Sequence, residues 1–420
     1  MMDSNIYPNA DSETTPGRRR VSRRLLLAGS AAAGLAVTAG CLGDDETETD
    51  AEPTDEATVY VFNTGDGSVS LIDVETDEVV RTAAIDMTSS FPSNQFSPRV
   101  TNSAADPLWL NVGESVRALA TGTLSEVASV ETGSGANWQE QTPDGDHLVV
   151  SAREPAHTQY RVDSNPDSEE FGSVTGEIDR QPEGGRGDNE GPGPCDITVH
   201  PDGEYAYVPD LFGDTLTVVS IDPFEIHRQV EVDPVNDVPP EPWMGTAAWD
   251  GETLLVENNE GEHGSESLWD VSDAASPVEL VRLTPDDGMG HDPLTSEIGP
   301  ASETGYVFTP GTADVTVVDL GDGTLEDRLD LGGEAFVGSW DPDREKLYVP
   351  VQTNDEVAVI DSEQREIVST IDVGPEPYGV TSATLRPASL PEDQQGQLPR
   401  LTGEYETTYC VGECACGHQL

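Results

Sequence analysis

Lys346-Leu-Tyr-Val-Pro350 is followed by two further segments, Glu356-Val-Ala-Val-Ile-Asp361 and Ile367-Val-Ser-Thr-Ile-Asp-Val373. All three alternate apolar with other residues, which is typical of β-strands, and Asn and Asp residues typical of turns lie between the first two. The Tyr-Val segment recurs at Thr58-Val-Tyr-Val-Phe-Asn63, Tyr205-Ala-Tyr-Val-Pro-Asp210 and Gly305-Tyr-Val-Phe-Thr309. The sequence therefore predicts a sheet unit that is repeated along the chain.

Weaker copies of the Tyr-Val segment fill the gaps between these four. They are Pro107-Leu-Trp-Leu-Asn-Val112, His147-Leu-Val-Val-Ser151 and Thr253-Leu-Leu-Val-Glu257. The starts of the seven segments are roughly 40 to 58 residues apart, a spacing close to that of four-stranded propeller blades. No convincing amphipathic helix follows the first 57 residues. We therefore predict an all-β, seven-bladed β-propeller with four-stranded blades over residues 58–388.

The repeats resemble the YVTN family of β-propellers, which is named for a Tyr-Val strand motif. The match is closest in residues 194–233 and 335–374, and the last repeat ends in Ile371-Asp-Val-Gly-Pro-Glu-Pro-Tyr-Gly-Val380, similar to the family's strand–Gly–Pro–Gly signature. Four repeats are close to the family pattern, while the second, third and fifth diverge. The resemblance implies a seven-bladed propeller with nearly all blades in one domain.

The order of the predicted strands indicates how the ring closes. The first repeat begins at its Tyr-Val strand and lacks an inner strand, whereas residues 378–384 are left over after the seventh repeat. Pairing this last strand with Thr58–Asn63 would complete the first blade and remove two exposed sheet edges. Six or eight blades remain alternatives, because residues 88–105 and 233–243 are irregular.

The first 41 residues resemble a Tat-type export signal with a lipobox. Arg23 and Arg24 precede a short apolar run, which ends at Ala39-Gly40-Cys41. This pattern predicts lipidation of Cys41, an acidic linker over residues 42–57, and a location on the extracellular face of the cell membrane. The alternative is a signal anchor that is never cleaved, which also places residues 42–420 outside the cell.

Acidic residues dominate the composition, with 81 Asp and Glu against 20 Lys and Arg and a formal net charge of −61. The only lysine is Lys346. Without residues 1–41, which hold five arginines and three acids, the formal charge is −63. Such a surface repels itself unless salt shortens the Debye length, and it resembles proteins of extreme halophiles, archaeal ones especially. It also argues against a nucleic-acid partner, since phosphate binding needs clustered Lys and Arg.

The loops that enter the inner strands of a propeller form one rim of its central channel. We predict a site for a small ligand or a partner protein at this rim. The alternative is that these residues only plug the channel. The candidates are Trp138, Cys195, Asp196, Trp243, Met244, His291, Asp292, Phe336 and Tyr378.

The C-terminal tail, residues 389–420, carries a dense group of sulfur and imidazole ligands: Cys410, Cys414, Cys416 and His418. Three thiols and one imidazole suit one soft metal ion, Zn or Cu. Outside the cell, disulfides that include Cys195 are an equal alternative. The third interpretation is a tail without function.

No phosphate-binding loop and no Gly-x-Ser-x-Gly nucleophile motif occurs in the sequence. The sequence therefore favours a surface-anchored binding module for a small ligand or partner protein. One alternative is a metal-dependent enzyme or redox protein, lactonase-like or of the copper-bearing propeller type, with its metal at the rim or in the tail. The other is a structural component of the cell envelope.

Overall fold

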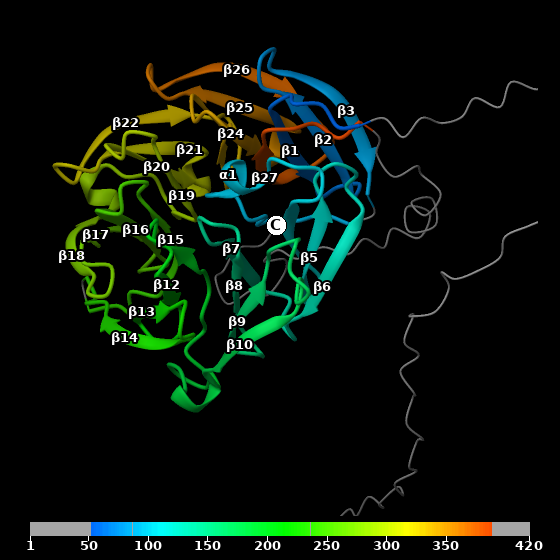
Figure 1. Ribbon diagram of the computed structural model, residues 1–420. Helices are drawn as coiled ribbons and strands as arrows, with labels where there is room; N and C mark the ends of the chain where they lie inside the picture. Colours follow the sequence, from blue (N-terminus) through cyan, green and yellow to red (C-terminus); the bar gives the residue numbers. More distant parts are fainter. Residues whose placement is uncertain (1–51, 86, 236, 389–420) are drawn as a thin grey trace, which may run out of the picture. The chain divides into compact units, whose positions relative to one another are not determined.

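Seven antiparallel sheets, arranged in a ring, make up the part of the chain that the computed structural model describes: residues 52–85, 87–235 and 237–388 (Figure 1). Each sheet is one blade. Six of these blades have four strands, and the second has three. The predicted all-β, seven-bladed propeller is thus confirmed, and the predicted signal, the lipidation site Cys41 and the C-terminal tail lie outside the described residues.

From the inner to the outer edge, blade one contains β27 (Pro377–Ala383), β1 (Thr58–Asn63), β2 (Ser68–Asp73) and β3 (Glu78–Ala84), and blade two contains β4 (Pro107–Val112), β5 (Ser115–Ala120) and β6 (Glu126–Glu131). Blade three contains β7 (Asn137–Gln141), β8 (His147–Ala152), β9 (Thr158–Asp163) and β10 (Val174–Asp179), and blade four contains β11 (Thr198–Val199), β12 (Tyr205–Asp210), β13 (Thr215–Ser220) and β14 (Glu225–Glu231). Blade five contains β15 (Pro242–Ala247), β16 (Thr253–Asn258), β17 (Ser265–Asp270) and β18 (Val278–Leu283). Blade six contains β19 (Ser296–Ile298), β20 (Thr304–Thr309), β21 (Asp314–Asp319) and β22 (Thr324–Asp330), and blade seven contains β23 (Ser339–Trp340), β24 (Lys346–Val351), β25 (Glu356–Asp361) and β26 (Glu366–Asp372).

Helices are short in the described residues. They are α1 (Ser97–Val100), η1 (Gln181–Glu183), η2 (Pro285–Asp287), η3 (Pro310–Thr312) and η4 (Gln352–Asn354). None of the described helices is long and apolar enough to cross a membrane.

The first blade is built from both ends of the described chain. Strand β27 pairs with β1 in an antiparallel register that places Thr58 opposite Ala383 and Asn63 opposite Pro377. A bridge between Thr54 and Arg386 extends this pairing, with N–O distances of 3.0 and 2.9 Å. The predicted closure is therefore confirmed, and the end of the predicted acidic linker is part of the closed ring.

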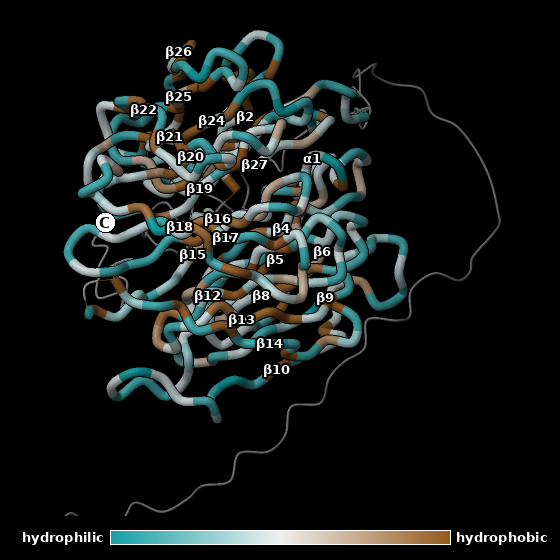
Figure 2. The backbone as a smooth tube through the Cα atoms, turned by 90° about the vertical axis from the view of Figure 1, so that its left-hand side faces the viewer, coloured by the Kyte–Doolittle hydropathy of each residue, from teal (hydrophilic) through white to brown (hydrophobic). Residues whose placement is uncertain are grey.

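Burial follows the position of a strand within its blade. Every residue of β1 and β4 is buried, whereas the outer strands β14 and β22 are mostly exposed. Neighbouring blades cover both faces of a middle strand, which explains its continuous apolar run. Figure 2 shows hydrophobic residues along the strands and hydrophilic residues in many of the loops.

Candidate functional site

Residues 88–96, here called the channel segment, occupy the place where blade two lacks an inner strand. The segment keeps one backbone bond to the blade, from Ser93 N to the Trp109 carbonyl at 3.0 Å. It also bonds to the Asn111 side chain of this blade, and it reaches other blades, since Asn94 donates to the Gly338 carbonyl at 2.9 Å and Gln95 to the Ala247 carbonyl at 2.7 Å. The channel segment, which belongs to the irregular residues 88–105 of the sequence, therefore fills the central channel. Figure 1 shows it with α1 near the middle of the ring.

Aromatic rings close the rim at which the inner strands begin, here called the start rim. Phe91 of the channel segment lies against Trp138, with ring centroids 4.3 Å apart, and meets the edge of Tyr378 at 5.6 Å. Tyr378 in turn stacks on Phe336, with centroids 4.9 Å apart and an interplanar angle of 6°. Phe91 therefore occupies the centre of the start rim.

The structure brings most of the predicted rim residues together. One hydrophobic cluster contains Trp138, Cys195, Trp243, Met244, Phe336 and Tyr378. All but the half-buried Trp138 are buried, which corresponds to the interpretation that such residues plug the channel. Asp196 lies deeper in the channel, and His291 and Asp292 are not part of the cluster. A role of these residues in ligand binding stays a prediction.

His291 has a partner that the sequence did not indicate. Its ring stacks on that of His263, with centroids 3.9 Å apart and an interplanar angle of 14°. The backbone N–H of Asp292 donates to the His263 carbonyl at 2.8 Å, which holds the two loops together. No group of three His, Cys, Asp or Glu side chains that could hold a metal is present among the described residues. The predicted tail site for Zn or Cu lies outside them.

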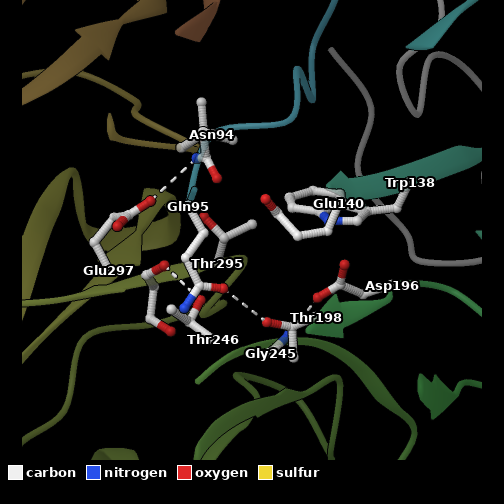
Figure 3. Close-up of a pocket in the computed structure, with 12 residues that line it drawn as sticks. Asn94, Gln95, Trp138, Glu140, Asp196, Thr198, Gly245, Thr246, Thr295 and Glu297 are labelled. Carbon is white, nitrogen blue, oxygen red and sulfur yellow. Dashed lines mark hydrogen bonds between the residues drawn. The ribbon is translucent and has the colours of Figure 1, made fainter. Parts of the chain in front are cut away.

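Below the start rim, the channel contains a small cavity, here called the carboxyl chamber, lined by Glu140, Asp196 and Glu297 of three different blades. Figure 3 shows Glu140 and Asp196 on one side and Glu297 on the other, with Asn94 and Gln95 between them. The cavity volume is about 20 Å³. Since about 10–15 Å³ is needed for one water molecule, a sugar or a peptide does not fit.

Each chamber carboxyl group is held by hydrogen bonds. Glu140 accepts one from the Ser93 hydroxyl at 3.2 Å, Glu297 one from the Asn94 amide at 3.1 Å, and Asp196 one from Gly245 N at 2.8 Å. Burial raises the pKa of Glu140 to about 8, and it raises the pKa values of Asp196 and Glu297 well above their ordinary range. The nearby carboxyl groups add to the rise for Asp196 and Glu297, because two like charges in a dry site repel. Burial therefore favours the protonated form of each of the three carboxyl groups.

A larger pocket lies on the other side of Asn94 and Gln95, at the rim where the inner strands end. We call it the arginine–tryptophan pocket; its volume is about 270 Å³. It is lined by Asn94, Gln95, Arg99, Trp249, Trp340, Pro342 and Arg344.

The two arginines of this pocket differ from most others in the described chain. Arg180, for example, holds Asp210 at 2.7 Å and Glu183 at 2.8 Å. Arg99 and Arg344 form no ion pair with any described residue, although acids outnumber bases fourfold in the sequence. Burial lowers the pKa of Arg344, and the neighbouring charge of Arg99 lowers it further. Two cations therefore share one pocket without a carboxylate partner from the described chain.

Tryptophan and backbone geometry fix the position of Arg344. Its guanidinium lies over the Trp249 ring, 4.5 Å from the centroid, in a cation–π contact. Arg344 has a φ of 59°, a left-handed conformation that ordinary side chains disfavour. Blades three, four and five place Gly145, Gly203 and Gly251 in the corresponding turn, with φ between 72° and 77°. Blade seven thus carries a long cationic side chain where three other blades have glycine.

This pocket was not among the sites predicted from the sequence. Arg99 belongs to a stretch without strand periodicity, and Arg344 lies in a turn of the seventh repeat. One signal was present, because a comparison of the repeats shows Asp341-Pro-Asp-Arg344 where another has His200-Pro-Asp-Gly203. A charged residue at the glycine position of such a turn is a signal of a site, because glycine adopts this backbone conformation more easily.

Solved structures with the same architecture include enzymes. The chain is similar to a periplasmic gluconolactonase of Pseudomonas aeruginosa, with 16% identity and a TM-score of 0.59 over 78% of this chain and 98% of that one. It is also similar to a putative 6-phosphogluconolactonase of Bacteroides fragilis, with 17% identity and a TM-score of 0.58 over 80% and 99% of the two chains. Hydrazine synthase of Kuenenia stuttgartiensis matches at 14% identity and a TM-score of 0.54 over 77% and 99%.

At such low identity these likenesses show the propeller fold alone. Comparison with protein-family models finds no match, and comparison with curated proteins finds none either. The resemblance to the YVTN family therefore stays a prediction.

Proposed function

We propose that the protein is a surface-anchored binding module that takes a small anionic ligand with a flat ring in the arginine–tryptophan pocket. The observation that carries this proposal is the pairing of Arg99 and Arg344 in one pocket without any carboxylate from the described residues. Two like charges beside each other are unfavourable in the free protein, and an anion between them would remove that repulsion.

The chemistry of the lining suits such a ligand. A guanidinium donates two parallel hydrogen bonds to a carboxylate or a phosphate, and it does so with defined geometry. The half-buried indole of Trp249 offers flat apolar surface beside the arginines, whereas Trp340 is only 3% exposed. A volume of about 270 Å³ lies near the lower end of ordinary ligand pockets, which favours a single ring over a larger molecule.

The negative charge of the chain predicts a high-salt environment, in which the ligand must be held by direct contacts with the protein. At about 1 M salt the Debye length is about 3 Å, so long-range attraction contributes little to affinity. A protein adapted to such salt would need short, geometrically specific contacts to hold an anion. The forked donors of Arg99 and Arg344 provide them.

Calorimetric titration with 6-phosphogluconate, benzoate and inorganic phosphate tests the proposal. A charge-assisted hydrogen bond contributes about 1.5–3 kcal/mol, so Arg344→Gln and Arg99→Gln should each weaken binding of the ring-bearing or sugar anion about 10- to 100-fold. Arg228→Gln is the matched control, since Arg228 is exposed on an outer strand and forms no ion pair with a described residue. Equal binding by all four proteins, or no binding of any anion, would refute this function.

A lactonase-like enzyme is the second candidate. Glu140 does not provide its acid or base, because the chamber that holds this carboxyl group is too small for a sugar. The names of two fold neighbours suggest gluconolactone and its 6-phosphate as substrates to try. Hydrolysis that disappears in Arg344→Gln would support the enzyme, whereas binding without turnover would support the binding module.

Anchoring outside the cell is the remaining part of the proposal. It rests on Arg23, Arg24 and Cys41 in the sequence, with the membrane reached through a lipid on Cys41. In the native host, Cys41→Ser should release the folded protein into the medium. Membrane association that persists in this variant would instead indicate an uncleaved signal anchor.

A further inference from the structure

Glu257 of β16 and Glu266 of β17 form a cross-strand pair inside blade five, and both side chains are fully buried. Directly opposed residues have Cβ atoms about 4.5–5.5 Å apart. The row continues on both sides, with Met244 opposite Glu257 on the inner strand and Leu283 opposite Glu266 on the outer one. Two carboxyl groups therefore lie side by side between buried apolar residues.

The other blades show what this position ordinarily contains. Four blades place an apolar pair at the corresponding register: Phe62–Val69, Pro209–Leu216, Phe308–Val315 and Pro350–Val357. The remaining two place uncharged pairs there, Asn111–Val116 and Ser151–Gln159. Blade five alone has two acids, so the fold itself does not require them.

The pair faces blade six. Leu255 and Leu268 lie two residues from the two acids on the same faces of their strands, and both belong to one hydrophobic cluster with Val307 of blade six. Ser296 of β19 is 3% exposed and lies close enough to Glu257 to lower its pKa. The site is therefore enclosed between two blades.

Oxygen atoms with few hydrogen-bond partners gather there. Both carboxylate oxygens of Glu266 form no hydrogen bond with a described residue, and the neighbouring donor of Glu257 is the Ser296 hydroxyl. Arg282 attracts Glu266 but makes its ion pairs elsewhere, with Glu260 at 2.7 Å and with Glu279 at 2.6 Å. Buried polar oxygens are rarely left in this state.

We propose that Glu257, Glu266 and Ser296 hold a calcium ion between blades five and six. Hard oxygen donors select hard cations, and two carboxylates balance the charge of one divalent ion. The two carboxylates and the hydroxyl supply five oxygen atoms, which suits the flexible geometry of calcium better than the near-ideal octahedron of magnesium, an ion that dehydrates reluctantly and usually keeps several waters. A fully buried site favours the ion that sheds its water more readily. The alternative occupant is protons, since burial also raises the pKa values of both groups.

The test must separate this site from the acidic surface, which also attracts calcium. The wild-type protein is passed through a gel-filtration column in metal-free molar KCl, which strips weakly held ions, and its calcium is measured by mass spectrometry. We expect about one ion per chain. The double variant Glu257→Gln/Glu266→Gln should lose it, whereas the control Glu225→Gln/Glu366→Gln, which changes two exposed acids on outer strands, should retain it.

Two further measurements keep the proposal testable if the glutamine variant does not fold. Glu257→Phe/Glu266→Val installs the pair that blade six carries as Phe308 and Val315, and it should fold without calcium. Chelation should lower the melting temperature of the wild type and leave that variant unchanged. A wild type without retained calcium, with an infrared band of protonated carboxyl groups that vanishes in this variant, would overturn the proposal and identify protons as the occupants. Equal calcium in wild type and variant would overturn it as well.

Discussion

The ammonium group of Lys346 lies 2.9 Å from both carboxylate oxygens of Asp77. It also donates to the Val74 carbonyl at 3.0 Å, and the Tyr348 hydroxyl donates to the same carboxylate at 2.6 Å. Lys346 begins β24 of blade seven, and Asp77 lies in the turn between β2 and β3 of blade one. The only lysine of the chain therefore joins the last blade to the first.

Removal of this lysine should weaken the seam between the two blades. Both side chains are partly buried, at 23% and 19% exposure, and the ammonium makes several charge-assisted bonds. We expect Lys346→Met to lower the free energy of unfolding by about 1.5–3 kcal/mol. Arg365→Met removes the more exposed pair with Glu326 and should lower it by less than about 1 kcal/mol. Denaturant unfolding of both variants measures the difference, and equal losses would contradict it.

Arg344 should contribute to binding and not to stability. Glycine at this position would remove the cost of the left-handed backbone, about 1–2 kcal/mol. This gain is offset, because glycine loses more conformational entropy on folding and the contact with Trp249 is lost. Arg344→Gly should therefore change the free energy of unfolding by less than about 1 kcal/mol, while anion binding falls about 10- to 100-fold.

Gly203→Ala is the control for the backbone, because Gly203 has a φ of 74° and alanine is strained there. It should lower stability by about 1 kcal/mol without an effect on binding. A larger loss in Arg344→Gly than in Gly203→Ala would show that the arginine holds the fold.

Glu140 should make stability depend on pH above the usual acid range. Its pKa is raised from 4.5 to about 8 in the folded state, so the folded protein holds a proton that the unfolded chain releases. The stability from this group is fully present below pH 4.5 and is lost as pH rises through 8. In that window the free energy of unfolding should fall by up to about 1.4 kcal/mol per pH unit. The slope of the free energy of unfolding against pH is proportional to the number of protons released on unfolding, and Glu140→Gln should lower that number by one. An identical slope in both proteins would contradict the raised pKa of Glu140.

Salt should control stability at constant pH. The chain without its first 41 residues carries a formal charge of −63. The Debye length grows from about 3 Å at 1 M salt to about 10 Å at 0.1 M, so carboxylates then repel each other across the surface. We expect the melting temperature to fall steeply over this range. A flat melting temperature would remove the basis for the predicted adaptation to salt.

The fold could be predicted because its information is local. Each Tyr-Val strand and the strand after it carry an alternating pattern, and the spare strand at Tyr378 leaves one place for closure. The channel segment could not be predicted, since Phe91 and Gln95 have no periodicity and the segment as a whole takes its position from hydrogen bonds to six other blades. Arg99 and Arg344 are far apart in the sequence and come together in one pocket only when the blades close into a ring. Glu257 and Glu266 were hidden for another reason: among 81 acids, two more carry no signal until their burial is known.

The closing strand has a consequence for the order of synthesis. Strand β1 is the first strand of the propeller to leave the ribosome, yet its inner partner β27 is the last. Until Pro377–Ala383 has been translated, blade one has an open edge that attracts other strands. A chain that stops short at any later blade keeps this edge exposed. The final strand thus acts as a check on completeness, because only a chain translated to its last blade can bury its first.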